Sequence, residues 1–481
     1  MFYAHNSEHK INLMILPLTK YSNPIWKQKF KNIPKITPEV KKLIANMRET
    51  LDLTSGVGIA APQVGQPLRL FIVDYGKLKE VFINPKLTRY GKESNEKEEG
   101  CLSVPGARGL VSRPKEVEIE YIDLKDRKKK AVLAGYYARI AQHEYDHLSS
   151  TFYVNRIIDK KKIYTYKPIK IVFFGTSEFA VPILRKLYGQ QIVGEIKVLL
   201  VVTAPDKPAG RGKMLTPSLV KQTAQDFNLS ILTPDSLKNN KHLIAKIQSL
   251  SPDFIVLASY GKIIPKEILD VPKKGAINVH PSLLPKYRGA SPIQAAILAG
   301  EKSTGVTIIR MNEKMDEGDI LASAKLRISA KDSAQSLSNK LAFLATRLIL
   351  HVLVLVYLGK IKPKPQKHKK ATYTKIIRKE DGFVDWKKPP ENLDLMIRAY
   401  YPWPGVWTYY SPAEALAKAG QVTRIRDQAR LPDLSADRQG GQGSGKKILK
   451  LLPNRMVQLE GKNPVSLKEF KAGHKDFTLS W

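Results

Sequence analysis

From residue 169 onward, short apolar runs alternate with stretches that have helical periodicity. The run Ile169–Phe174 predicts a buried strand, and Glu178–Leu187 predicts the helix after it, with Pro182 in the first turns, where proline is tolerated best. Further apolar runs, separated by helical stretches, are Val198–Thr203, Phe254–Ser259, Ala276–Val279 and Val306–Arg310. The alternation predicts a mainly parallel sheet with helices on both faces, in which sites form beyond the carboxyl ends of the strands.

One long apolar stretch, Leu341–Leu358, has to be weighed as a membrane span. Arg347 and His351 interrupt it, and Lys340 and Lys360 flank it. Because ionisable side chains are costly inside a bilayer, we expect a buried amphipathic helix and no membrane association.

Polar stretches divide the chain into three domains and a linker. The first domain ends after a lysine-rich stretch, Asp159–Lys162, and Ile361–Lys370 is almost wholly Lys, Pro, Gln and His, which predicts an extended, solvated linker. The β-like pieces Phe383–Trp386, Val406–Tyr410 and Met456–Leu459 predict a small barrel, and Leu434–Gly445 predicts a mobile loop. The expected boundaries are 1–167, 168–358, 359–372 for the linker, and 373–481.

Composition adds information about partners and compartment. Lys and Arg number 80 against 44 Asp and Glu, a formal charge of +36, which favours a polyanionic partner such as nucleic acid. The single cysteine excludes a disulfide within the chain and fits a reducing cytosol. Met1–Leu18 lacks the pattern of a signal peptide, so we expect a cytoplasmic protein.

Candidate metal chemistry lies in a segment of helical character, Tyr137–Leu148. His143 and His147 are four residues apart, so both imidazoles project from one helix face and can bind one metal, with Glu144 beside the bound water. The alternative is that these are two surface histidines on a charged helix, which would give the same sequence pattern. Cys101, within Glu99–Ser103, reads equally as a small buried thiol.

Together with the glycine-rich stretch Gly56–Gln63, these motifs resemble peptide deformylase over about the first 160 residues. The resemblance implies a compact α+β domain with the metal-binding helix at its centre and Fe(II) as the metal, readily replaced by Zn, Ni or Co. It implies that Cys101, His143 and His147 are the metal ligands and that Glu144 transfers the proton. It also implies that the side chain of Gln63 and the backbone N–H of Leu102 are the oxyanion donors, and that Gly58 and Arg108 bind the substrate. The family usually has Gly and Asp where this chain has Ser149 or Ser150 and Asn155, which concerns local packing.

A second candidate site follows the predicted strand Ala276–Val279. Asn278 and His280 are two apart, so on an extended segment they point the same way and can share one reacting carbonyl. Taken alone, this pair could equally be a capped loop with a surface histidine. The surrounding motifs are Ile171–Thr176, Val202–Lys213, Ser282–Gly289, Thr304–Thr307, Met315–Asp319, Tyr401–Gly405 and Glu460–Lys462.

From Ile169 to the C-terminus these motifs resemble methionyl-tRNA formyltransferase. The resemblance implies that Asn278 stabilises the oxyanion, that His280 moves the proton of the attacking amine, and that Asp316 orients His280. It implies a site for 10-formyltetrahydrofolate at Ser282, Leu283, Leu284 and Pro285. Asp316 is preferred to Asp319 because the family's carboxylate stands two residues before the glycine, although Met315 and Glu317 differ from the usual Leu and Thr.

The basic loop around Arg211 and Lys213 is a candidate for gripping the tRNA acceptor end, and a merely solvated loop is the alternative reading. The C-terminal segment resembles the family's oligonucleotide-binding-like (OB-like) barrel. Ser411–Lys447 fits the family poorly and reads as an insertion. The expected fold is multidomain: an α+β metallohydrolase domain, an α/β doubly wound (Rossmann-like) formyltransferase domain, and a small OB-like β-barrel.

The leading hypothesis is therefore one polypeptide with two activities. One formylates initiator methionyl-tRNA, and the other removes formyl from formyl-methionyl nascent peptides, at the ribosome. Three alternatives stay open: an inert deformylase portion that docks on ribosome or tRNA, a zinc protease marked by the His-Glu-x-x-His string, and a formyltransferase that acts on a sugar or nucleotide. Cys101 argues against the protease, since that class generally uses a carboxylate or histidine as third ligand.

Overall fold

The computed structural model describes residues 14–54, 56–157, 159–209, 214–385, 388–410 and 447–473, which form two compact units. The first unit runs to Val256 and includes Asp270–Lys274; the second holds Leu257–Leu269 and the described residues from Gly275 onward. Several predicted features lie outside the described residues, and these are Arg211, Lys213, Trp386, the loop Leu434–Gly445 and the insertion up to residue 446.

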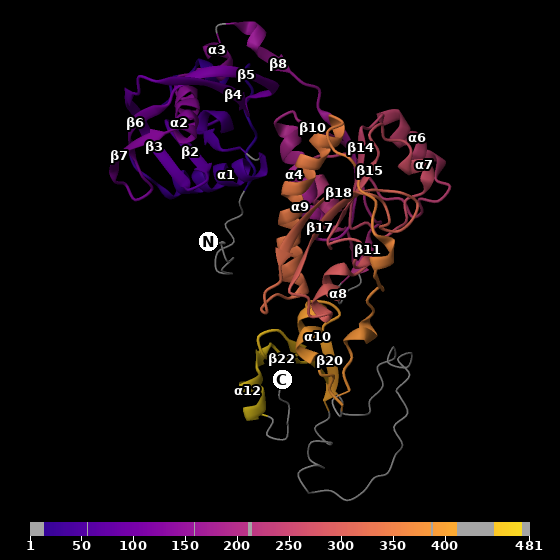
Figure 1. The fold of residues 1–481 in the computed structure, drawn as a ribbon. Helices are drawn as coiled ribbons and strands as arrows, with labels where there is room; N and C mark the ends of the chain where they lie inside the picture. Colours follow the sequence, from indigo (N-terminus) through magenta and orange to yellow (C-terminus); the bar gives the residue numbers. More distant parts are fainter. Residues whose placement is uncertain are drawn as a thin grey trace, which may run out of the picture. The chain divides into compact units, whose positions relative to one another are not determined.

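The described residues between 14 and 165 form an α+β domain (Figure 1). Its helices are η1 (Pro24–Lys27), α1 (Pro38–Thr54), η2 (Ala61–Val64), α2 (Tyr136–His147), α3 (Tyr153–Arg156) and η3 (Lys160–Lys162). Its strands are β1 (Gly58–Ala60), β2 (Leu70–Tyr75), β3 (Leu78–Tyr90), β4 (Ser94–Cys101), β5 (Val104–Pro114), β6 (Glu116–Ile122), β7 (Lys128–Ala134) and β8 (Ile163–Thr165). They form a five-stranded antiparallel sheet, β1-β2-β3-β6-β7, and a three-stranded sheet, β4-β5-β8.

Two of this domain's apolar clusters lie one on each face of the five-stranded sheet. Alternate residues of β2 face opposite sides: Phe71 packs with Ala138 and Ala141 of α2, whereas Ile72 packs with Met47 of α1. Helix α2 also contacts β5 of the smaller sheet, and Figure 1 shows it in the middle of the domain. The predicted helix Tyr137–Leu148 is thus confirmed to within one residue, and it is the central helix.

The remainder of the first unit begins with the predicted buried strand. Its strands are β9 (Ile169–Gly175), β10 (Ile196–Val202), β11 (Lys207–Ala209), β12 (Met214–Thr216), β13 (Ile231–Leu232) and the first three residues of β14 (Phe254–Ala258), and its helices are α4 (Ala180–Ile192), α5 (Leu219–Asp226) and α6 (Lys241–Leu250). Strand β10 pairs in parallel with β9 and β13, and Ile171, Val172, Phe173 and Phe174 are all fully buried, as expected for a strand covered on both faces.

The second unit carries the other half of the pattern. Its helices are α7 (Lys266–Leu269), α8 (Pro292–Leu298), α9 (Ala334–Tyr357), η4 (His368–Lys370), η5 (Lys379–Gly382), α10 (Leu393–Tyr400) and α12 (Leu467–Gly473). Its strands are β15 (Ala276–His280), β16 (Arg288–Gly289), β17 (Ser303–Arg310), β18 (Ile320–Arg327), β19 (Tyr373–Thr374), β20 (Val406–Tyr410), β21 (Lys447–Leu452), β22 (Met456–Leu459) and β23 (Val465–Ser466). Strands β20-β21-β22-β23 form a four-stranded antiparallel sheet near the C-terminus.

Three predictions from the sequence need correction. The expected parallel pairing does not extend to the second unit, where β15, β17 and β18 pair antiparallel; the nine-residue loop Met311–Asp319 that joins β17 to β18 is too short for a parallel crossover. Phe383 is not in a strand: it follows η5 and makes a single bridge to Trp407. The linker 361–370 is not wholly solvated, because Gln366 is buried.

The long apolar stretch is helix α9, and its apolar side chains divide between a buried and an exposed face. Leu341, Ile349 and Val352 are fully buried, whereas Phe343 and Val354 are exposed. The helix is long and apolar enough to cross a bilayer, and 44% of its most apolar window is buried inside the protein. It contacts β17, β18 and α8, which is the packing of an amphipathic core helix.

Candidate active sites

The predicted metal ligands come together in the N-terminal domain. His143 and His147 project from α2 and Cys101 ends β4, and their ligand atoms all lie within 4.8 Å of one another. Cys101 Sγ is 3.3 Å from Nε2 of His147. The rings of Trp26 and Phe152 pack beside His147, so the cluster has an apolar wall.

Glu99 orients one of these ligands. Its carboxylate lies 2.9 Å from Nδ1 of His143, which leaves Nε2 of that ring for a metal. Arg113 and Arg139 donate to the same carboxylate, Arg113 through two nitrogens at 2.7 and 2.9 Å and Arg139 at 2.6 Å. Burial alone would raise the pKa of Glu99, but the hydrogen bonds from His143 and Arg113 outweigh it and lower the pKa well below its usual range.

The ionic cluster continues along α2 to Asp146. Arg113, 2% exposed, also donates to Asp146 at 2.8 Å, and Arg156 forms a second ion pair with Asp146. No role for Glu99, Arg113, Arg139 or Asp146 is predicted from the sequence. One signal was available: Arg113 stands two residues after buried Val111 in β5, on the inward-facing side of the strand.

Glu144 lies beside the three ligands and is almost fully buried. Burial raises the pKa of Glu144 to about 7, in the range where a group can both accept and return a proton. Among the described residues its Oε2 is a buried oxygen with no hydrogen-bond partner. The backbone of Gly58 passes so close that a Cβ there would stand 2.4 Å from Oε1 of Glu144, so only glycine leaves room for this carboxylate.

The predicted oxyanion donors are also at this site. Gln63 is 1% exposed, and its Oε1 accepts a hydrogen bond from the backbone N–H of Ala60 at 2.8 Å. That bond turns Nε2 toward Cys101 Sγ at 3.6 Å and toward Ser103 Oγ at 3.4 Å. Leu102 lines the same pocket.

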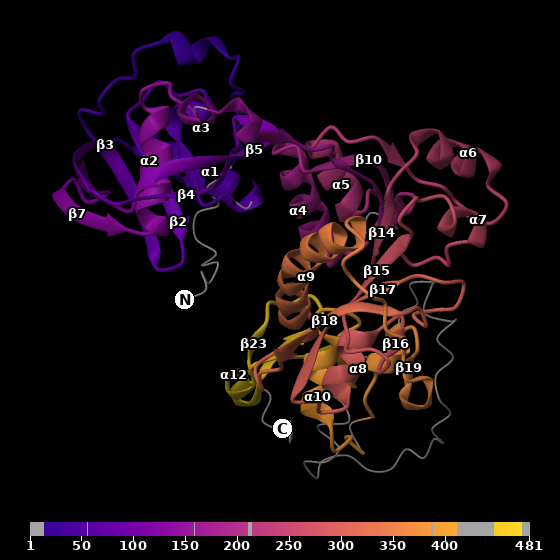
Figure 2. The same cartoon turned by 45° about the horizontal axis from the view of Figure 1, so that its top comes forward.

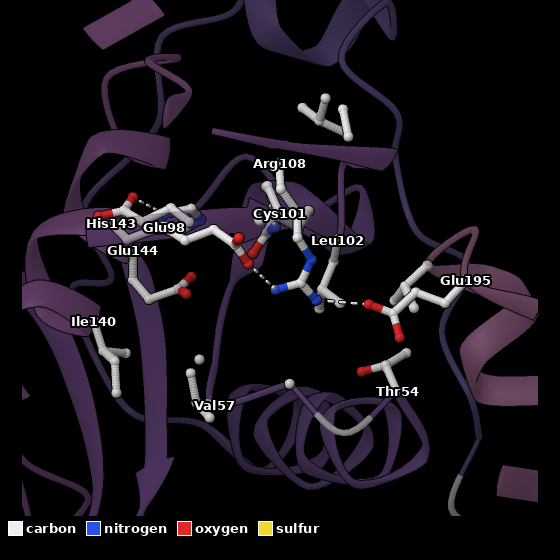
Figure 3. Close-up of a pocket in the computed structure, with 18 of the residues that line it drawn as sticks. Thr54, Val57, Glu98, Cys101, Leu102, Arg108, Ile140, His143, Glu144 and Glu195 are labelled. Atoms are coloured by element: carbon white, nitrogen blue, oxygen red, sulfur yellow. Dashed lines mark hydrogen bonds and ion pairs between the residues drawn. The ribbon is translucent and has the colours of Figure 1, made fainter. Parts of the chain in front are cut away.

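A pocket of about 340 Å³ opens onto these groups, and its lining includes Gly58, Gln63, Cys101, Leu102, Arg108, His143 and Glu144. Figure 3 shows Arg108 reaching across it, with ion pairs to Glu98 at 3.0 Å and to Glu195 at 2.6 Å. A cationic side chain over the pocket suits its predicted role of holding a peptide backbone, and both carboxylates compete with a ligand for it.

The donor set fits a divalent metal. One thiol and two imidazoles are ligands for a transition metal such as iron or zinc. Burial opposes a proton on His143, but hydrogen bonds to Cys101 and Glu99 raise the pKa of His143 well above its usual value, so the cluster favours positive charge. Burial and the neighbouring His143 lower the pKa of His147, which keeps that imidazole in the neutral, ligand form.

The second predicted set also comes together, in the second unit. Asn278 and His280 lie on β15, 7% and 4% exposed. Asn278 Nδ2 donates to Oδ1 of Asp316 at 2.9 Å, and His280 Nδ1 lies 3.5 Å from Oδ2 of Asp316. The other ring nitrogen of His280 lies 2.8 Å from the carbonyl of Tyr287. The structure therefore places the amide, imidazole and carboxylate on one side of the strand end, as the spacing predicts.

The predicted folate motif is fixed by a threonine. Thr307 Oγ1 donates to the carbonyl of Ser282 at 2.7 Å and accepts from the N–H of Leu284 at 3.1 Å. Ser282 in turn donates to the carbonyl of Lys286 at 2.7 Å. The peptide bond between Leu284 and Pro285 is cis. The loop after β15 thus has a defined shape next to His280.

The departures from the family patterns are accommodated locally. Ser150 has φ +55°, a left-handed conformation that explains why glycine is usual there. Asn155 accepts a hydrogen bond from the N–H of Phe152 at 2.9 Å, as an aspartate would. Glu317 receives hydrogen bonds or ion pairs from Tyr373 and Arg288 at 2.9 and 3.1 Å.

The two sites define a protein with a metal-dependent amide hydrolase centre followed by a formyl-transfer centre. Residues 15–163 match the family model described as polypeptide deformylase, residues 169–353 match formyl transferase, and residues 376–475 match the formyl transferase C-terminal domain. The chain belongs to the methionyl-tRNA formyltransferase family and carries a polypeptide deformylase domain in front of it.

The chain covers nearly the whole length of its curated methionyl-tRNA formyltransferase relatives. The methionyl-tRNA formyltransferase of Caldanaerobacter subterraneus is 40% identical over 307 residues, which are 64% of this chain and 97% of that protein. That of Thermodesulfovibrio yellowstonii is 40% identical over 307 residues, 63% of this chain and 96% of its own. Among solved structures, peptide deformylase from Thermotoga maritima is 34% identical and covers 30% of this chain and 98% of its own, with a TM-score of 0.29.

Proposed function

We propose that this chain is a bifunctional enzyme of the formyl-methionine cycle. It hydrolyses the N-formyl group of formyl-methionyl nascent peptides, and it transfers formyl from 10-formyltetrahydrofolate to the amino group of methionyl-initiator-tRNA. The observation that carries the proposal is that both sets of reacting groups are complete in one chain: Cys101, His143, His147 and Glu144 in one domain, and Asn278, His280 and Asp316 in another.

In the deformylase site, Cys101, His143 and His147 would hold Fe²⁺, with Zn²⁺, Ni²⁺ or Co²⁺ as substitutes. Such an ion supplies Lewis-acid activation of the attacking water. Glu144 then takes the proton from that water and returns it to the leaving amine, a task that suits its near-neutral pKa.

The other residues of the pocket act on the formyl peptide. Gln63 Nε2 and the N–H of Leu102 face the oxygen of the formyl carbonyl as negative charge develops on it. Arg108 exchanges its ion pairs with Glu98 and Glu195 for the backbone of the peptide, and Gly58 lines the pocket close to Glu144.

In the transferase site, the amine of methionyl-tRNA attacks the formyl carbon of the folate, whose N10–formyl bond then breaks. His280 accepts the proton that the amine loses and passes it to the departing N10, and Asp316 stabilises the charge that the imidazole carries in between. Asn278 has a second amide hydrogen besides the one donated to Asp316, and that hydrogen faces the developing oxyanion. Ser282, Leu283, Leu284 and Pro285 line the folate.

The partners follow from charge and from the family. The +36 formal charge supports binding of tRNA, with Arg211 and Lys213 on the acceptor end. We propose that the strands around β9 and β15 form a Rossmann-like domain and that the four-stranded sheet β20-β21-β22-β23 belongs to an OB-like domain for the tRNA body. We place the domain boundaries at 1–167, 168–358 and 373–481, and the protein in the cytoplasm at the ribosome.

The test is to assay both reactions on one purified protein. With metal supplied, the chain releases formate from a formyl-methionyl tripeptide; with 10-formyltetrahydrofolate, it formylates methionyl-tRNA. Glu144→Ala abolishes the first reaction and spares the second, and His280→Ala does the reverse, so each variant is the folding control for the other. Failure of the wild-type protein in either assay, or full deformylation by Glu144→Ala, contradicts the proposal.

A further inference from the structure

Gln366 does not behave as a solvated linker residue. Its side chain is 5% exposed, although most of its neighbours in the linker are exposed. The amide makes four hydrogen bonds, two as donor through Nε2 and two as acceptor through Oε1. These four bonds use the full capacity of a glutamine amide, so its orientation is unambiguous.

The donor side of Gln366 holds the backbone of the loop that carries Asp316. Nε2 donates to the carbonyl of Asp316 at 2.8 Å and to that of Gly318 at 2.7 Å. Asp316 has φ +54°, a left-handed conformation that residues other than glycine adopt rarely and keep where their surroundings hold them in it. Gln366 thus bridges two carbonyls around a strained residue whose carboxylate faces His280.

The acceptor side of Gln366 reaches the same carboxylate by another route. Oε1 accepts from Nη2 of Arg288 at 2.8 Å and from Nε at 3.2 Å, and Arg288 is 1% exposed. The next residue, Gly289, donates its backbone N–H to Oδ2 of Asp316 at 2.8 Å. The short strands β16 and β19, which Figure 2 shows beside α8, pair Arg288 with Tyr373 and Gly289 with Thr374.

We propose that Gln366 is a positioning residue for formyl transfer: its amide fixes the Asp316 carboxylate against Asn278 and His280. The Gln366 amide thereby connects the backbone of the loop that carries Asp316 to Arg288. Arg288 directly precedes Gly289, whose N–H donates to the Asp316 carboxylate. The inference rests on the proposed transferase function, because it matters only if Asp316 acts with His280 in the reaction.

The first test replaces the amide with an apolar side chain of similar length. We expect Gln366→Met to lower kcat for methionyl-tRNA formylation about 10- to 100-fold, the scale of a small misplacement of a reacting group, with little change in either KM. Lys367→Met, at the exposed neighbouring position, is the matched control and keeps the wild-type kcat. Gln366→Glu keeps an acceptor for Arg288 but has no hydrogen for the two carbonyls, and we expect it to lose kcat like the methionine variant.

The second test separates positioning from a general structural effect. In an Asp316→Ala background, Gln366→Met is expected to cause no further loss of kcat, because the carboxylate it positions is absent. An equal additional loss in that background, or wild-type kcat in both Gln366 variants, would overturn the inference. A wild-type protein that does not formylate, or an Asp316→Ala variant with full kcat, would instead overturn the proposed function.

Discussion

Gly58 gives the sharpest prediction, because one methyl group there meets the proton-transfer carboxylate directly. The Cβ of Gly58→Ala would stand 2.4 Å from Oε1 and 2.8 Å from Cδ of Glu144, whereas Cβ contacts below 3.0 Å are essentially never seen. The carboxylate must therefore retreat by about 0.6 Å, the difference between these two distances. Misplacement of a reacting group by about 1 Å costs roughly 10²-fold in rate, so we expect a loss of 10- to 100-fold, about 1.4–2.7 kcal/mol of barrier.

The assay is formate release from a formyl-methionyl tripeptide, with metal content and methionyl-tRNA formylation measured on the same preparation. We expect unchanged metal content, because the three atoms nearest to the new methyl group all belong to Glu144 and none to a metal ligand, and unchanged formylation. Gly100→Ala is the control: Gly100 lines the same pocket, but its new Cβ would meet nothing closer than 3.5 Å. Wild-type deformylation by Gly58→Ala would refute the reasoning that this glycine makes room for Glu144.

Three further outcomes are expected. Glu99→Gln weakens metal binding about 10- to 100-fold, because the charged acceptor at Nδ1 of His143 is lost. This loss is measured by titrating the metal and following both activity and bound metal content. Ser150→Gly raises the free energy of unfolding by about 0.5–1 kcal/mol in denaturant titrations, because the residue has φ +55°. Thr307→Val raises the KM for 10-formyltetrahydrofolate about tenfold and leaves deformylation unchanged, because the hydroxyl that holds Ser282 is lost.

The sequence predicts the reacting groups of both sites because their spacing follows from local geometry. Two histidines four apart on a helix share a face, and Asn278 and His280 two apart on a strand share a side. The structure brings each set together as expected. Such patterns need no knowledge of the rest of the fold.

Groups that act across the fold are not predictable in this way. Glu99 and Arg139 are 40 residues apart, and Gln366 and Asp316 are 50 apart, so no local period links them. Composition was misleading for Gln366, because a run of lysine, proline and glutamine predicts a solvated chain. The antiparallel pairing of β17 and β18 was missed for a related reason, since apolar runs reveal strands but not their direction.

The buried arginine Arg113 has a consequence for how the metal is acquired. Its partners Glu99 and Asp146 are protein groups on β4 and α2, so the two elements that carry the metal ligands are tied together by the polypeptide itself. Domains whose ligands meet only around an ion unfold when a chelator removes it. Here the scaffold is preformed, and a chelator should silence the site while the fold survives, so that one metal can be exchanged for another without refolding.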